Sequence, residues 1–490
     1  MRNLALVALA AVLASCASPP PPGPVETDVE VAAAWSVEDS VLSGADADSL
    51  QQDWWSDIGG TSLDSLVREA LDANYSLAIA AANVDAARAG ADIAGAPRLP
   101  QINASYGASR QEQAIIGIPV GPDPVLKTLN SAHNAQLTAN WEIDLWNKLG
   151  QQEKAALADY QASEADLAGA RLSIAARVTR TWLNLVEARA QADLAERAYE
   201  AFSETAETSW DRYQRGLIPA IDVHLTRTSR DNAAALLALR RQQVEVFARQ
   251  LELLLGRYPR AELDTPIVLP DAPAIPPSGL PADLLLRRPD LLAAERRLVA
   301  AGARTSSAKR AMLPTISLTG AAGFTSNALE DILKGDFSVW SIGGSVLQPL
   351  FQGGRLRAQA RQNAAFETAA VNAWADQVLT AFGEVEVALA SEQWLREREE
   401  NLRSSSDSAL AAYELSQSRY RQGVGSLFEV LESQRRALDA EGQWIAVRNA
   451  RLNARVDLFL ALGGGFDATT GAPVTDFLTQ NATEPQGADR

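Results

Sequence analysis

Few side chains in this chain could carry out covalent or metal chemistry. Its 490 residues include two His, two Met and one Cys, and His133 and His224 lie in different segments. A protein metal site needs several ligands at suitable spacing, so we predict none. The sequence contains no GxxxxGK[ST] phosphate loop and no Ser/His/Asp set of recognisable spacing. These residue types indicate that the protein is not an enzyme.

The charge balance and the hydropathy pattern exclude further classes of function. The formal net charge is −17 at pH 7. Binding to a phosphate backbone requires a basic surface, so we expect no nucleic-acid partner. After Cys16 the chain has no run of about 20 apolar residues, the length of a membrane-spanning helix. The mature protein is therefore either soluble on a tether or crosses a membrane as β-strands.

The one thiol belongs to Cys16, at the end of the tetrad Leu13-Ala14-Ser15-Cys16. A basic residue and a short apolar run precede the tetrad, so we interpret residues 1–15 as a signal peptide. The tetrad resembles a bacterial lipobox, in which the thiol takes a diacylglyceryl group. We therefore predict a covalent lipid on Cys16 and no other cofactor. An ordinary secretory signal with a chance cysteine is the alternative. Residues 16–53 then form the lipid anchor and a Pro-rich linker.

A duplication sets the domain organisation. Arg212-Tyr213-Gln214-Arg215-Gly216-Leu217 recurs as Arg419-Tyr420-Arg421-Gln422-Gly423-Val424. Such long-range repetition predicts two copies of one structural unit. The predicted domains are a first repeat at 54–257, a Pro-rich crossover at 258–281, a second repeat at 282–465 and a polar tail at 466–490.

Long segments without proline predict two helical hairpins. The predicted long helices span residues 147–215 and 353–422, and the predicted return helices span residues 219–256 and 426–463. At about 1.5 Å per residue each long helix would measure about 100 Å. Gly216 and Gly423 fall where a helix C-terminus needs a left-handed residue. Small or apolar residues recur at seven-residue steps, as in a coiled coil, at Val178, Leu185, Ala192, Tyr199, Ala206 and Tyr213.

Alternating apolar and polar residues predict two pairs of strands. The predicted strands span residues 101–117, 131–145, 315–326 and 337–347. Their length and their one apolar face are typical of transmembrane barrel strands. Four strands cannot close a barrel, since single-chain barrels start at about eight. Other chains must complete the sheet, and three copies give twelve strands. A small soluble sheet under a helical body is the alternative.

Three segments resemble one known family. They are Trp54-Trp55, Leu285-Leu286-Arg287-Arg288-Pro289-Asp290-Leu291 and Pro349-Leu350-Phe351-Gln352-Gly353-Gly354-Arg355. Together with the lipobox they resemble the NodT-type lipoproteins among the TolC-like outer-membrane factors of RND efflux systems. The resemblance implies an α+β membrane protein that forms a homotrimer. The trimer would have a twelve-stranded outer-membrane barrel and an α-helical periplasmic tunnel.

The resemblance also implies a function and partners. Such a channel is the passive exit duct of a tripartite efflux system for small molecules. It sits in outer-membrane lipid and works with a periplasmic adaptor protein and an inner-membrane RND-type pump. Two alternatives stay open. The same fold can serve as the outer-membrane duct of type I protein secretion, and a lipid-anchored coiled-coil scaffold would have no pore.

The two repeated turns are the expected docking sites. In the family such turns are the periplasmic tips that receive the adaptor, and the alternative is that they only cap helices. The residues predicted to form these adaptor-docking tips are Tyr213, Arg215, Gly216, Leu217, Tyr420, Gly423, Val424 and Gly425.

The second repeat carries a charged helix face that the first repeat lacks. Phe428, Glu432 and Arg435 are spaced i, i+4 and i+7, and Glu429 lies beside them. The first repeat has Ile221, Leu225 and Thr228 there, with Asp222 at the position of Glu429. The resemblance implies a periplasmic gate at Phe428, Glu429 and Glu432, with Phe428 as an apolar collar and Glu432 as a negative ring. Arg435 lies one turn from Glu432, so we assign it to the gate as a latch that holds the closed state. A surface Glu–Arg pair is the alternative.

Overall fold

The computed structural model describes residue 35 and residues 53–116, 125–276, 287–332 and 334–464. The chain divides into two compact units. Residues within 89–159 and 297–375 form the first unit, and the helical parts within 31–88, 160–296 and 376–490 form the second. The signal peptide, Cys16 and the polar tail lie outside the described residues.

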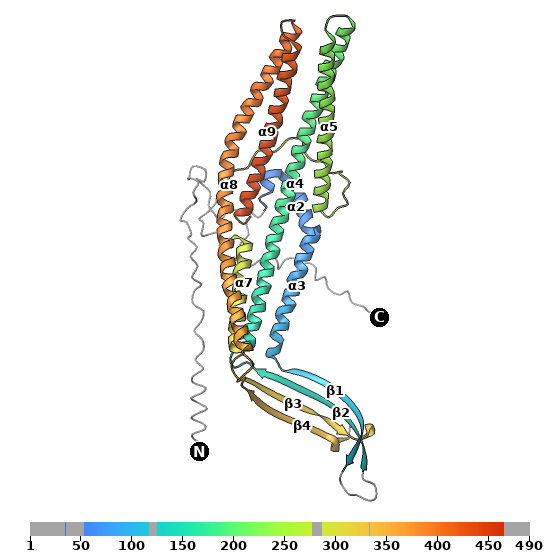
Figure 1. Ribbon diagram of the computed structural model, residues 1–490, viewed down its shortest axis with the longest axis vertical. Coiled ribbons are helices and arrows are strands. Elements are labelled where there is room, and N and C mark those ends of the chain that lie inside the picture. Colours follow the sequence, from blue (N-terminus) through green and yellow to red (C-terminus); the bar gives the residue numbers. More distant parts are fainter. Residues whose placement is uncertain (1–34, 36–52, 117–124, 277–286, 333, 465–490) are drawn as a thin grey trace. The chain divides into compact units, whose positions relative to one another are not determined.

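One antiparallel sheet dominates the first unit, with strand order β1-β2-β3-β4 (Figure 1). Its strands are β1 (Gln101–Ile116), β2 (Val125–Ile143), β3 (Thr315–Ser326) and β4 (Ser338–Leu347). The prediction of two strand pairs is confirmed, but β2 begins at Val125 rather than near residue 131. Its first residues pair with β1 alone, because the pairing with β3 begins only at His133.

The sheet has two open edges, β1 and β4. Every residue of β4 is exposed, and so are its large apolar side chains. Trp340, for example, is 76% exposed. An exposed edge strand of this kind presents unpaired N–H and C=O groups to any further strand.

The described chain contains seven α-helices of eight residues or more. They are α2 (Ser56–Ala73), α3 (Tyr75–Gly95), α4 (Lys148–Gln214), α5 (Ala220–Leu254), α7 (Pro289–Arg310), α8 (Arg355–Arg421) and α9 (Leu427–Ala461). α4 and α8 each have 67 residues, and α5 and α9 each have 35, as two copies of one unit require. Figure 1 shows α4 with α5 and α8 with α9 as antiparallel pairs. The predicted hairpins are confirmed, whereas the sequence pattern predicted no element for residues 56–95.

The core of the second unit forms around the tryptophans that precede α2. Trp54 is fully buried and stacks on Phe459 of α9, with ring centroids 5.0 Å apart. Trp182, Leu183 and Leu185 of α4 belong to the same cluster. The Trp54-Trp55 pair therefore stabilises the packing between helices far apart in sequence. None of the described helices combines the length and the hydropathy needed to span a membrane.

The buried seam of α4 differs in part from the predicted heptad. Val178, Leu185 and Ala206 are buried as expected. Ala192 and Tyr199 are only half-buried, and Gln191 and Ala198 occupy the buried stripe beside them. The prediction was wrong at these two positions, because the buried stripe lies one residue earlier than the seven-residue steps. Tyr213 is 40% exposed, so the seam does not reach the turn.

Four polar clamps hold the described part of the crossover, which has no helix or strand between residues 258 and 276. The Glu252 carboxylate accepts hydrogen bonds from the backbone N–H groups of Ala261 and Glu262. Arg189 of α4 donates to the carbonyls of residues 263 and 265. Arg448 and Arg455 of α9 donate to the carbonyls of residues 270 and 273. Side chains from both hairpins thus form hydrogen bonds with N–H and C=O groups of the crossover, which has no regular secondary structure to pair them.

A buried ladder of charges joins α8 to α9. Arg455 and Glu392 are each 1% exposed, and Arg455 Nη2 lies 2.6 Å from Glu392 Oε1. Arg451 contacts the same carboxylate at 3.0 Å and Glu399 at 2.9 Å. These pairs fix the register of α8 against α9, because each charge must meet its partner away from water.

Replacing Arg455 by Met should destabilise the fold, because Glu392 then loses its closest partner while it stays buried. Breaking a buried ion pair on one side costs about 3–5 kcal/mol. We expect a lower thermal unfolding midpoint in detergent for Arg455→Met. The control Arg241→Met removes an exposed pair with Glu196, whose loss should hardly move the midpoint. Equal midpoints for the two variants would contradict the assignment.

Candidate functional site

The two hairpin turns have the same backbone geometry. Gly216 has φ +71° and Gly423 has φ +77°, as predicted for residues that end a helix in the left-handed conformation. In the first turn the N–H of Leu217 bonds the carbonyl of Arg212 at 2.9 Å, and in the second turn Val424 bonds Arg419 at 3.0 Å. The duplication therefore preserves the hydrogen bonds of the turn as well as its sequence.

The helices that follow the turns begin differently. α5 starts after Pro219, which provides no side-chain cap. α9 starts after Ser426, whose hydroxyl accepts a hydrogen bond from the N–H of Glu429. The Glu429 carboxylate reaches back to the N–H of Ser426, which completes a capping box. Glu429 thus has a structural role at the helix start, and its assignment to the gate stays a prediction.

Large apolar side chains are exposed at both turns. Leu217 is 68% exposed and Val424 is 65% exposed. In the first hairpin Trp210 lies against Tyr213, and the guanidinium of Arg227 lies over the Trp210 ring at 4.7 Å. Apolar groups that one chain leaves uncovered in this way are suited to contact another protein.

The charged face of α9 forms a chain of ion pairs. Glu432 contacts Arg435 at 3.0 Å and Arg436 at 2.8 Å, and Arg435 also contacts Asp439 at 2.9 Å. The hydrogen bonds from Arg435 and then from Arg436 hold the pKa of the Glu432 carboxyl below its ordinary value. Arg436 and Asp439 were missed in the sequence, although their i+4 spacing from Glu432 and Arg435 would have indicated them.

Phe428 lies near the start of α9 and is 69% exposed. Its counterpart in the first repeat, Ile221, is 64% exposed. Both hairpins thus leave an apolar side chain uncovered just after the turn, and the asymmetry between the repeats lies in the charges that follow.

A direct contact between the hairpins near their turns was not predicted. Arg212 at the end of α4 donates a hydrogen bond to the hydroxyl of Tyr420 at the end of α8, at 3.1 Å. The guanidinium carbon also lies 5.3 Å from the centre of the Tyr420 ring. Tyr420 was among the predicted tip residues, but its partner is distant in sequence and no local pattern reveals it.

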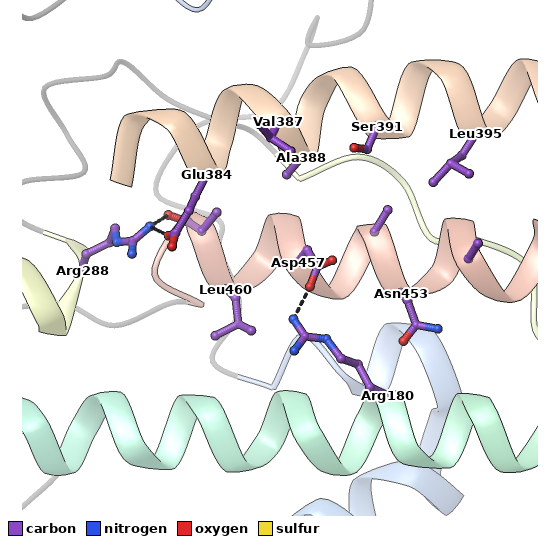
Figure 2. A pocket seen from close by; sticks show the side chains of 13 residues that line it. Arg180, Arg288, Glu384, Val387, Ala388, Ser391, Leu395, Asn453, Asp457 and Leu460 are labelled. Carbon is purple, nitrogen blue, oxygen red and sulfur yellow. Dashed lines mark hydrogen bonds and ion pairs between the residues drawn. The ribbon is translucent and has the colours of Figure 1, made fainter. Parts of the chain in front are cut away.

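A cavity of about 730 Å³ lies between α4, α8 and α9 (Figure 2). Figure 2 shows Arg288 facing Glu384, at 2.6 Å, and Arg180 facing Asp457. Arg288 also donates to Asp290 and to the carbonyl of Ala461. The charges that line the cavity are therefore paired with one another. Arg288 and Asp290, in the segment interpreted as a helix start, join the start of α7 to α8 and to the end of α9.

Comparison with known proteins decides the family. The sequence profile described as "Outer membrane efflux protein" matches residues 66–257 and 280–464. The chain belongs to the outer membrane efflux protein family. The two matched segments correspond to the two repeats, so both halves contribute to the assignment.

Two Pseudomonas outer membrane proteins match this sequence along most of its length. The toluene efflux pump outer membrane protein TtgF of Pseudomonas putida is 31% identical over 477 residues, which cover 96% of this chain and 98% of that protein. Outer membrane protein OprJ of Pseudomonas aeruginosa is 33% identical over 443 residues, 89% of this chain and 91% of OprJ.

Two solved structures of outer-membrane channels have the same fold as this chain. The Campylobacter jejuni CmeC outer membrane channel has a TM-score of 0.85 and 26% identity, and the match covers 95% of this chain and 98% of CmeC. The outer-membrane channel OprN has a TM-score of 0.82 and 27% identity, with 91% of this chain and 99% of OprN covered. This member of the family is therefore a channel protein of an efflux system in the bacterial outer membrane, and it is not an enzyme.

Proposed function

We propose that three copies of this chain form one gated channel, which passively conducts small molecules from an inner-membrane RND-type pump and a periplasmic adaptor to the outside. The observation that carries the proposal is the four-stranded sheet with open edges at β1 and β4. In hydrocarbon an unpaired strand edge is not tolerated, because no water replaces the missing hydrogen bonds. Pairing β4 of one copy with β1 of the next closes a ring of twelve strands.

Exposed apolar side chains on the strands support this membrane assignment. Ile102 of β1 and Ile342 of β4 are each 71% exposed in the single chain. Side chains of this type are suited to face lipid, whereas the alternation along each strand turns polar residues to the other side. A lipid on Cys16 would add an anchor in the same membrane, as two signals hold a protein more firmly than one.

The two turns are the proposed docking site for the adaptor. Their left-handed glycines make each hairpin end compact, and Leu217 and Val424 remain exposed there. Relatives such as the toluene efflux pump outer membrane protein TtgF are named as components of pump systems. We assign the same kind of partnership to this chain, with substrate choice made by the pump.

The second hairpin is the proposed gate. In a ring of three chains, Phe428 would form an apolar collar and Glu432 a ring of carboxylates. Arg435 and Arg436 pair with Glu432 in the single chain and lower its pKa. A ring of ionised carboxylates at a constriction attracts cations, and Arg435 can hold the face in one arrangement by its second contact, with Asp439.

Removing the lipid tests the barrel. The Cys16→Ser variant should remain trimeric and should partition into membranes, because the strands alone require a lipid environment. Light scattering in detergent would give the oligomeric state, and planar bilayers would give single-channel currents. A fully soluble monomer without currents would refute both the trimer and the pore, and would favour the coiled-coil scaffold instead.

Changing the turn glycines tests the docking. Gly216→Val with Gly423→Val forces a β-branched residue into a left-handed conformation, at about 1–2 kcal/mol for each residue. We expect weaker co-purification with a periplasmic adaptor of the same bacterium, with the trimer intact. The control Gly90→Val places its side chain in open space on α3 without positive φ. Unchanged adaptor binding by the double variant would show that the turns only cap helices.

Neutralising Glu432 tests the gate. Glu432→Ala should raise the conductance of the closed channel and reduce its preference for cations in planar bilayers, because the carboxylate ring and its arginine pairs are lost. Glu245→Ala is the control, since Glu245 forms a similar i,i+4 pair with Arg249 on the first hairpin. If the two variants had the same conductance and ion preference, the Glu432 pairs would be ordinary surface ion pairs.

A further inference from the structure

Apolar side chains share one face of the whole sheet. Ile102 of β1 pairs with Ala139 of β2, which pairs with Gly320 of β3. Gly320 in turn pairs with Ile342 of β4. Paired residues point to the same face, and every second residue along a strand returns to it. In a membrane, the face that carries Ile102 and Ile342 is the one that contacts lipid.

An aromatic row marks one limit of this lipid-side face. Tyr106 pairs with Ala135, which pairs with Phe324. Aromatic side chains gather at the edges of the lipid-facing band of a membrane protein, where apolar and aqueous surroundings meet. Beyond this row the face becomes polar, because the Tyr106 hydroxyl lies 2.9 Å from Nδ1 of His133.

This limit lies at the end of the sheet away from the helices. β1 begins shortly after α3 ends, and β2 ends shortly before α4 begins. The connection between β1 and β2 is therefore at the opposite end of the strands. In the proposed channel the helices lie in the periplasm, so this end of β1 and β2 lies at the outer surface of the membrane.

β1 and β2 continue past the other two strands at this end (Figure 1). The pairing of β2 with β3 stops at His133 and Ser326, whereas β1 and β2 stay paired as far as Ile116 and Val125. We call residues 109–116 and 125–132 the outer ribbon. Because the outer ribbon follows directly on the aromatic row, its side chains lie at the level of lipid headgroups.

The charged residues of the outer ribbon all lie on the lipid-side face. Arg110 and Glu112 are an even number of residues from Ile102, and Lys127 is an even number from Ala139. The other face of the ribbon is uncharged over the same described residues, and its polar members are Ser109, Gln111, Gln113, Thr128 and Asn130. This sorting indicates that the charged face has a contact of its own at the membrane surface.

Positive charge is in excess on this face. Arg110 and Lys127 stand against Glu112 alone, in a chain whose formal net charge is −17. Lys127 Nζ lies 3.8 Å from Glu112 Oε1, and the two side chains are 67% and 59% exposed. An ammonium group has three donors, so a single long contact at the surface leaves it able to bind another anion.

The segment between β3 and β4 lies at the same end of the sheet and has the opposite balance. Three carboxylates and one lysine occur there, at Glu330, Asp331, Asp336 and Lys334. The lysine is already paired, with Asp331. The positive excess at this end is therefore a property of the outer ribbon and not of every strand connection.

We propose that Arg110 and Lys127 of the outer ribbon bind the phosphate groups of lipopolysaccharide in the outer leaflet. This inference rests on the proposed channel, which places the sheet in the outer membrane. The acyl chains contact the apolar face, and the phosphates above them meet the guanidinium and the ammonium. Both cations are suited to phosphate, arginine through its planar fork and lysine as a point charge.

Binding of lipid A to the purified trimer tests the site. The probes are lipid A with two phosphates and the same lipid after both phosphates are removed. Arg110→Gln with Lys127→Gln should raise the apparent Kd for the phosphorylated probe about tenfold or more, because each cation near an anionic lipid surface contributes to binding. Native mass spectrometry in detergent measures the bound lipid. The exchange Arg110→Lys with Lys127→Arg keeps both charges and should bind like the parent protein.

Arg241→Gln with Arg249→Gln is the matched control. Both arginines pair with carboxylates on exposed helix surface, and their removal changes the net charge by the same amount. We expect unchanged binding of lipid A. An equal loss of affinity in this control would show that the overall charge attracts the lipid, and would overturn the proposal.

The remaining outcomes separate the lipid site from the channel. If the ribbon variant binds phosphorylated lipid A as tightly as the parent, or if the probe without phosphates binds equally well, the site is refuted while the channel stands. Inorganic phosphate that binds as well as lipid A would show a general anion site, which also refutes it. Currents in planar bilayers test the channel, and the ribbon variant should conduct like the parent. A parent trimer that binds lipid A through these cations but passes no current would contradict the channel alone.

Discussion

The open edges of one small sheet are the constraint on which the rest of the structure depends. β1 and β4 each leave a row of backbone groups to be paired, and the chain belongs to a family of outer-membrane channels. Hydrocarbon offers no substitute for those hydrogen bonds, so other copies must supply them. The proposed trimer follows from this need. It also explains why the single chain exposes apolar residues along β4, and why each repeat contributes one strand pair and one helical hairpin.

The long helices face a different constraint, because a two-helix hairpin has little interior in which to bury charge. Polar side chains nevertheless form its most specific contacts. Arg455 and Glu392 set α8 against α9, and Arg288 joins the start of α7 to α8 and α9. Arginines on α4 and α9 hold the crossover by its carbonyls. A buried charge is tolerated only when its partner lies next to it. These contacts therefore select one register between the helices, whereas apolar packing alone would allow several.

Much of the fold and part of the site could be predicted from sequence. The repeated turns, the strand pairs and the long hairpins were correct because proline spacing, alternation and left-handed glycines are local signals. Sequence patterns failed where a residue serves a role that its type does not suggest. Gln191 occupies a buried stripe in place of Ala192, Glu429 completes a capping box that was overlooked, and residues 56–95 form α2 and α3, for which no element was predicted.

By itself the sequence determined the duplication, the length of the long helices and the position of the two hairpin turns, since these depend on residues close together along the chain. The tertiary structure alone decided which distant side chains meet. Arg212 bonds Tyr420, Gln191 bonds the carbonyl of Gly442, and Trp54 stacks on Phe459. Such pairs leave no periodic pattern, because their contact depends on how two long helices are placed against each other, and that placement is set by the summed packing of the whole interface.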